Sequence, residues 1–192
     1  MNKNLNIYFV SLGCARNTVD TEVMITHILN NGWKIATEPD KADVIIINTC
    51  SFINSAKQES IQVILEMTEY KKINPKMLLI VAGCLSQRYK SELPKNLLEV
   101  DLFIGTEQIK NITKFIQQMY NNNIKKGTVI TQKTMYIHDE NVTKVNTLSS
   151  ASTYIKVSEG CNHNCTFCVI PSIRGPLRSR LTEHIIKEIK TL

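Results

Sequence analysis

The chain has 192 residues, 43% of them hydrophobic and 21% charged, with a formal net charge of +6 at pH 7. This composition suits a chain with a buried core and excludes a disordered one. The basic excess is too mild to indicate nucleic-acid binding, and no apolar run reaches the roughly 18 residues of a membrane-spanning helix. The apolar stretch before Cys14 is too short for an export signal, so we expect a cytoplasmic protein with six reduced cysteines.

Four short apolar runs predict buried strands in the first 104 residues. Their consecutive Ile, Val, Leu and Phe residues are typical of strands that are covered on both faces. The runs are Ile7–Leu12, Val44–Ile47, Met77–Ala82 and Leu102–Ile104.

Helical patterns separate these strands. Thr18–Asn31 carries an apolar stripe, with Asp20 and Glu22 expected in its first turn, where the helix dipole favours anions. Ser55 with a glutamine three residues later predicts a capping box, and Thr106 is expected to cap a third helix. The alternation predicts an α/β fold for residues 1–120, with an open parallel sheet and helices on both faces.

The character of the chain changes after residue 120. Residues 121–152 are polar, and we expect an edge strand around Thr128–Thr131 followed by a linker. A new unit, residues 153–192, should begin with a strand at Tyr154–Val157 and continue to a helix capped by Thr182. Because that helix is still running at Leu192, we expect this second domain to be incomplete.

Three cysteines, Cys161, Cys165 and Cys168, fall within eight residues. An odd number cannot pair internally as disulfides, and the short spacing points three sulfurs toward one centre. The spacing favours an iron–sulfur cluster. A zinc site, with His163 as the fourth ligand, and incidental thiols remain the alternatives.

The other three cysteines, Cys14, Cys50 and Cys84, each follow a predicted strand and precede a predicted helix. They are 36 and 34 residues apart, about one strand–helix–strand unit each, so a parallel sheet would bring them to the same edge. Gly13 and Gly83 remove side-chain bulk beside two of them. A second cluster site is favoured, and buried cysteines acting as small apolar residues are the alternative.

Local motifs around the later cysteines resemble a known family. The loop Glu159–Cys168 resembles the CxxxCxΦC loop of radical S-adenosylmethionine (SAM) enzymes, with Phe167 as the aromatic residue. The continuation Val169–Gly175 and the tripeptide Arg178–Arg180 are similar to the methylthiotransferase branch of that superfamily.

The earlier cysteine segments extend the resemblance over nearly the whole chain. Ser11–Glu22 and Asn48–Ser60 resemble the corresponding segments of the subfamily that modifies ribosomal protein S12. The sister subfamily, which modifies tRNA adenosine, typically has Phe-Gly-Cys-Gln-Met-Asn at the first segment. This tRNA-modifying subfamily is the first alternative. A non-catalytic zinc or redox thiol protein is the alternative from another functional class.

The resemblance implies two [4Fe–4S] clusters and SAM as cofactors. One cluster would lie on Cys14, Cys50 and Cys84, and the SAM-binding one would lie on Cys161, Cys165 and Cys168. It also implies that residues 153–192 begin a radical SAM partial α/β barrel, truncated here. The expected activity is transfer of a methylthio group to the β-carbon of an aspartate in ribosomal protein S12, with an electron donor as a further partner. Nucleic-acid contact would come through a C-terminal module, and we expect the 192-residue chain alone to bind clusters without turning over.

We predict separate roles for several polar residues near these motifs and assign none of them as catalytic. His163 is expected to shape its loop. Arg174, Arg178 and Arg180 are expected either to meet the SAM carboxylate or an acidic substrate segment, or to form a solvated basic surface. We expect three further polar residues to act in helix caps and turns: Asn17, Asn48 and Asp20.

Overall fold

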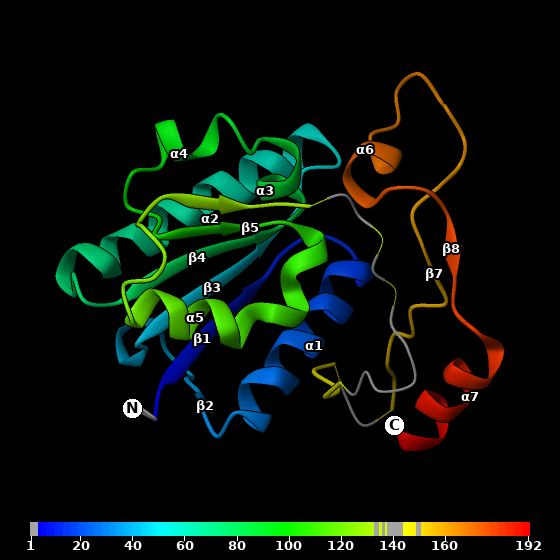
Figure 1. Cartoon of the computed structure of the whole chain (residues 1–192), viewed down its shortest axis with the longest axis horizontal. Coiled ribbons are helices and arrows are strands. Elements are labelled where there is room, and N and C mark those ends of the chain that lie inside the picture. Colours follow the sequence, from blue (N-terminus) through cyan, green and yellow to red (C-terminus); the bar gives the residue numbers. More distant parts are fainter. Residues whose placement is uncertain (1–3, 133–134, 136, 138–143, 149–150) are drawn as a thin grey trace.

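Six parallel strands form the centre of the molecule in the order β2-β1-β3-β4-β5-β6 (Figure 1). The computed structural model describes residues 4–132, 135, 137, 144–148 and 151–192. The strands are β1 (Asn6–Ser11), β2 (Lys34–Ile35), β3 (Val44–Thr49), β4 (Leu78–Gly83), β5 (Leu102–Ile104) and β6 (Thr128–Ile130). The predicted parallel α/β sheet is thus confirmed, and β6 is the expected edge strand. The two exposed residues of β2 carry too little apolar pattern to have been predicted.

Helices cover both faces of this sheet because its central strands are apolar on both sides. In β3, Val44 and Ile46 face one core, and Ile45 and Ile47 face the other. Helices α1 (Ala15–Asn30) and α5 (Ile112–Tyr120) cover the first face. The second face is covered by α2 (Asn54–Ile73), α3 (Cys84–Arg88) and α4 (Leu93–Asn96), on the opposite side of the sheet in Figure 1.

The starts of the helices differ from the predicted ones. Helix α1 begins at Ala15, so Asp20 and Glu22 lie beyond its first turn and are buried. The capping box at Ser55 was wrong, since α2 already begins at Asn54 with Ile53 at its N-cap. Thr106 is the first residue of a 3₁₀ helix, η2 (Thr106–Asn111), and Gly105 holds the N-cap position in its place. The Thr106 hydroxyl instead donates to the Ile173 carbonyl (3.3 Å).

Beyond the sheet, residues 144–148 and 151–192 form what we call the C-terminal segment. It contains a small antiparallel pair, β7 (Ser158–Glu159) with β8 (Arg178–Ser179), and two helices, α6 (Ile170–Arg174) and α7 (Thr182–Thr191). The strand predicted at Tyr154–Val157 was wrong, because those residues are not in a strand and β7 begins at Ser158. Leu181, and not Thr182, holds the N-cap of α7.

The C-terminal segment has almost no apolar core of its own. Among its described residues, Ile173 is the one buried hydrophobic side chain, at 2% exposure. It lies in α6, directly before Arg174, where the segment meets the sheet (Figure 1). The division into domains at residues 120 and 152 remains a prediction, and part of 121–152 lies outside the described residues.

In the described part of the chain, the helices are either too short or too polar to cross a lipid bilayer.

Candidate functional site

Cys14, Cys50 and Cys84 lie just past the carboxyl ends of three neighbouring strands, β1, β3 and β4. Thr49 of β3 pairs with Gly83 of β4, so Cys50 and Cys84 each follow a residue of the same pair. The strand order reverses at β1, which has β2 on one side and β3 on the other. Open α/β sheets bind their ligands at such a reversal, outside the carboxyl ends of the strands.

The three cysteines line one cavity of about 820 Å³. Cys50 and Cys84 are buried, whereas Cys14 is exposed at the mouth. The walls are largely apolar, and their apolar side chains come from residues 52–56, at and just before the start of α2, and from helix α6 of the C-terminal segment. The apolar side chains among them are Phe52, Ile53, Ala56, Ile170 and Ile173. The cavity is therefore closed on one side by residues more than 80 positions away from the nearest of the three cysteines.

Two glycines allow the strand ends to come this close. Gly13 and Gly83 both have positive φ angles, 91° and 95°. A Cβ atom at Gly13 would lie 2.5 Å from the Cβ of Cys50, and one at Gly83 would lie 2.3 Å from Asn48 Oδ1. Larger residues would be strained at both positions and would displace the strand ends that carry the thiols.

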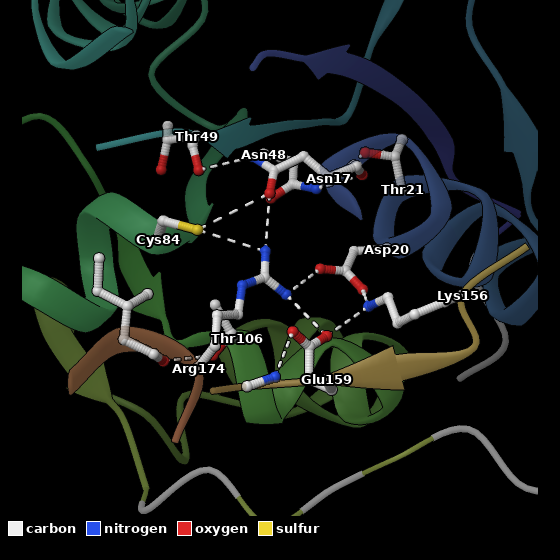
Figure 2. Close-up of polar contacts among 12 residues, drawn as sticks. Asn17, Asp20, Thr21, Asn48, Thr49, Cys84, Thr106, Lys156, Glu159 and Arg174 are labelled. Atoms are coloured by element: carbon white, nitrogen blue, oxygen red, sulfur yellow. Dashed lines mark hydrogen bonds and ion pairs between the residues drawn. The ribbon is translucent and has the colours of Figure 1, made fainter. Parts of the chain in front are cut away.

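Arg174 contacts the sulfur of Cys84 across this cavity (Figure 2). Its Nη2 donates to Cys84 Sγ at 3.3 Å and to Asn17 Oδ1 at 2.8 Å. The Cys84 thiol itself donates to the same Asn17 oxygen at 3.8 Å. Burial raises the pKa of the Cys84 thiol, and the neighbouring Arg174 acts in the opposite direction.

The other side of the Arg174 guanidinium belongs to a buried ion cluster of two cations and two carboxylates. Arg174 Nη1 donates to Asp20 (2.7 Å) and Glu159 (3.3 Å), and Lys156 Nζ pairs with the same two carboxylates at 2.5 and 2.8 Å. Every one of the four side chains is at most 7% exposed. Burial works to raise the pKa of Glu159, but Lys156 and Arg174 outweigh it and hold that pKa below its ordinary value.

The sequence missed this cluster. The predicted solvated surface is wrong for Arg174 and Arg180, which are 3% and 6% exposed. Arg180 pairs with Glu188 and donates to the Lys156 carbonyl (3.0 Å). Asp20 is an ion-pair partner and not a cap or turn residue. A usable signal was present, because Asp20 lies between Val19 and Val23 in α1, which predicts burial and therefore a partner.

Two asparagines that were also predicted to act in caps and turns join the strand ends to helix α1. Asn17 Nδ2 donates to the carbonyls of Leu12 and Thr49, both at 2.9 Å. Asn48 Nδ2 donates to the Asn17 carbonyl (2.9 Å) and to Thr21 Oγ1 (3.0 Å). These buried bonds fix the backbone beside Cys14 and Cys50.

A second buried contact holds the start of the C-terminal segment on α1. Glu22 is fully buried and pairs with Lys144 Nζ at 2.7 Å. It also accepts from the backbone N–H and the hydroxyl of Thr147, at 2.9 and 3.0 Å. Val145 N–H donates to Thr26 Oγ1 (2.9 Å). Helix α1 therefore provides polar contacts for the C-terminal segment along two of its turns.

Cys161, Cys165 and Cys168 lie on the loop between β7 and α6. Cys165 is exposed and the other two are half-buried. Cys161 N–H donates to the Gly175 carbonyl (3.1 Å), and His163 N–H donates to Cys161 Sγ (3.5 Å). The neighbouring Phe167 is 84% exposed. The loop is thus anchored at its first cysteine and open to solvent at its tip.

Each cysteine set offers three thiols, the donor type that holds iron–sulfur clusters. Cys14, Cys50 and Cys84 line one cavity, and Cys161, Cys165 and Cys168 lie on one open loop. Within the described ranges, no three His, Cys, Asp or Glu side chains are grouped closely enough to hold one metal ion.

The chain is similar to curated proteins over nearly its whole length. Ribosomal protein uS12 methylthiotransferase RimO of Akkermansia muciniphila is 42% identical over 191 residues, covering 98% of this chain and 42% of the relative. The protein of that name from Acetivibrio thermocellus is 44% identical, with 100% and 43% coverage. The one from Campylobacter jejuni is 45% identical, with 97% and 40% coverage. The chain thus spans about two-fifths of the length of these curated relatives.

The sequence profile described as Uncharacterized protein family UPF0004 matches residues 6–105. This stretch contains β1, β3 and β4 and all three cysteines of the cavity. The chain therefore belongs to the UPF0004 family, and the matched region is the part of the sheet whose strand ends carry Cys14, Cys50 and Cys84.

Proposed function

We propose that this protein is a radical SAM methylthiotransferase that adds a methylthio group to the β-carbon of an aspartate in ribosomal protein uS12. The observation that carries the proposal is the meeting of three cysteines, 36 and 34 residues apart, in one cavity closed by the segment that bears the other three. Relatives at 42–45% identity carry the name uS12 methylthiotransferase, which supports this substrate over tRNA adenosine.

Each cysteine set has its own part in this proposal. Cys14, Cys50 and Cys84 would hold one [4Fe–4S] cluster, and Cys161, Cys165 and Cys168 would hold the other. When bound, the clusters supply the electron that cleaves SAM and the site that carries the sulfur to be transferred. The open loop of the second set leaves room for SAM, in keeping with the exposure of Cys165.

The residues around the cavity would protect a reactive radical. Phe52, Ile53 and Ile170 present apolar surface beside the thiols, which limits the entry of water and of stray hydrogen donors. The ion cluster of Asp20, Lys156, Glu159 and Arg174 would hold the two cysteine sets in a fixed relation. We place the reaction in the cytoplasm, with an electron donor as a further partner and nucleic-acid contact through a C-terminal module.

Anaerobic reconstitution with iron and sulfide tests the cofactors. We expect about eight iron ions per chain and broad visible absorbance. Replacing Cys14, Cys50 and Cys84 with alanine, or Cys161, Cys165 and Cys168, should each remove about half of the iron. The matched control is His163→Ala, which should keep all of it, since a zinc site would need that imidazole. A chain that takes up no iron, or loses it with His163, contradicts the proposal.

The substrate is tested with the full-length enzyme, SAM, sulfide and a reductant. Mass spectrometry should find the methylthio group on uS12 and not on tRNA offered in a parallel reaction. Modification of tRNA alone would assign the protein to the sister activity.

A further inference from the structure

A three-residue stretch of the C-terminal segment, Ile173 to Gly175, contacts both cysteine sets. The side chain of Arg174 reaches Cys84 Sγ in the cavity (3.3 Å). The carbonyl of Gly175, the next residue, accepts from the N–H of Cys161 (3.1 Å). The Ile173 carbonyl accepts from Thr106 Oγ1 (3.3 Å), which ties the stretch to the start of η2.

Arg174 also reaches the second cysteine set through its side chain. Its Nη1 donates to Glu159, two residues before Cys161, and Glu159 Oε1 in turn accepts from Gly160 N–H (3.3 Å). One guanidinium therefore lies between a sulfur of the first set and the loop that carries the second (Figure 2). This arrangement suits arginine, because the planar guanidinium donates from two separate terminal nitrogens, whereas a lysine ammonium carries all its donors on one nitrogen.

We propose that Arg174 is a positioning residue that joins the two cysteine sets and tunes the first one by donating a hydrogen bond to the sulfur of Cys84. The inference rests on the proposed function, because it assigns Cys84 as a cluster ligand. Arg174 is thereby neither a SAM ligand nor a substrate contact; its donors are directed to Asn17, Asp20, Cys84 and Glu159.

The physical consequence is a shift in reduction potential. Reduction adds negative charge to a cluster, and a cationic donor at a ligand sulfur stabilises that charge. Loss of the Cys84 hydrogen bond should therefore lower the potential of the Cys14–Cys50–Cys84 cluster. If the positive charge is lost as well, Lys156 is the remaining cation of the ion cluster beside Asp20 and Glu159. The reduction potential of the Cys14–Cys50–Cys84 cluster should then fall further.

The test uses the full chain with Cys161, Cys165 and Cys168 replaced by alanine, so that one cluster gives the signal. Arg174→Lys keeps the positive charge but lacks the planar guanidinium. Arg174→Gln lacks both the charge and the guanidinium. Arg180→Lys is the matched control, because Arg180 is equally buried, lies in the same segment and pairs with Glu188. The readouts are iron content, the electron paramagnetic resonance spectrum of the reduced cluster and its midpoint potential.

We expect unchanged iron content, an altered spectrum and a more negative potential for Arg174→Lys, a larger shift for Arg174→Gln, and no shift for Arg180→Lys. If Arg174→Gln fails to fold, the potential measured for Arg174→Lys alone tests the inference. An unmoved potential in Arg174→Lys, or an equal shift in Arg180→Lys, overturns this inference and leaves the proposed function intact. A parent chain that takes up no iron overturns both.

Discussion

The sheet and the C-terminal segment bury different kinds of side chain. In β3, Val44 to Ile47 are four consecutive apolar residues with no exposed surface. The C-terminal segment meets the sheet through charges instead, with Lys144 on Glu22 and with Lys156 and Arg174 on Asp20. An apolar core loses stability in proportion to the atoms removed. A buried charge depends on one specific partner, and loss of that partner leaves an ion without water or counter-ion.

This contrast implies that the C-terminal segment can be released while the sheet remains folded. The two cysteine sets also differ in how they are held in place. The cavity set is held by three strand ends, whereas the position of the loop set relative to the cavity depends largely on the ion cluster. The following predictions test that separation.

The largest effect is expected from Asp20→Asn, which removes a carboxylate shared by Lys156 and Arg174. Breaking a buried pair in this way costs about 3–5 kcal/mol, and we expect the loss in the opening of the C-terminal segment. Hydrogen exchange should show lost protection at residues 156–180 and retained protection in β3 and β4. Glu69→Gln, which breaks the exposed pair with Lys72, is the control and should leave stability nearly unchanged, because water screens an exposed pair. Equal loss of protection in β3 and β4 would contradict the separation.

Ile46→Ala should act on the sheet itself. The side chain is fully buried in the core of β1, β3 and β4, and the cavity left behind costs about 2–5 kcal/mol. Denaturant unfolding should show the loss globally, since the C-terminal segment has no core that would survive the sheet. The control Ile73→Ala, at a side chain 84% exposed, should change stability little. Selective loss of protection in the C-terminal segment would argue against this view.

Gly83→Ala should strain the strand end that carries Cys84. A positive φ costs about 1–2 kcal/mol for alanine, and contacts with Asn48 and Thr49 at under 3 Å add to it, giving about 2–3 kcal/mol in all. Gly127→Ala is the matched control, with φ of 76° and open space around its Cβ position, and should cost only about 1 kcal/mol. Thermal unfolding of the two variants measures the difference. Equal losses would mean that the close approach at Gly83 is unimportant.

The smallest effect concerns alkaline pH and Tyr120 of α5. Burial, together with Asp43 and Asp101, raises the pKa of this phenol from 10.0 to about 12. The protonated phenol therefore stabilises the fold fully below pH 10, and this contribution is lost as the pH rises from 10 to 12. Because Tyr120 is only partly buried, we expect at most about 2 kcal/mol. The stability of the parent chain should fall more steeply than that of Tyr120→Phe over this window, and parallel curves would rule the effect out.

Much of the sheet could be predicted from local sequence, since β1, β3, β4 and β5 are largely continuous apolar runs. Helix starts were predicted less well. Helix α2 begins one residue before Ser55, and the Thr106 hydroxyl makes its hydrogen bond outside the helix that it opens. Thr106 donates to Ile173, a residue 67 positions away, and no local pattern contains that information. The short strands β2, β7 and β8 have two residues each, too few to show an alternation.

The spacing of Cys14, Cys50 and Cys84 is enough to bring them to one edge, because spacing of one strand–helix unit in a parallel sheet leaves little freedom. The loop set is equally evident from the sequence, since its members are within eight residues. The partners of Arg174, in contrast, depend on how the chain packs. Asp20 lies 154 residues away from it, and a buried charge selects its partner by position in space and not by distance along the chain.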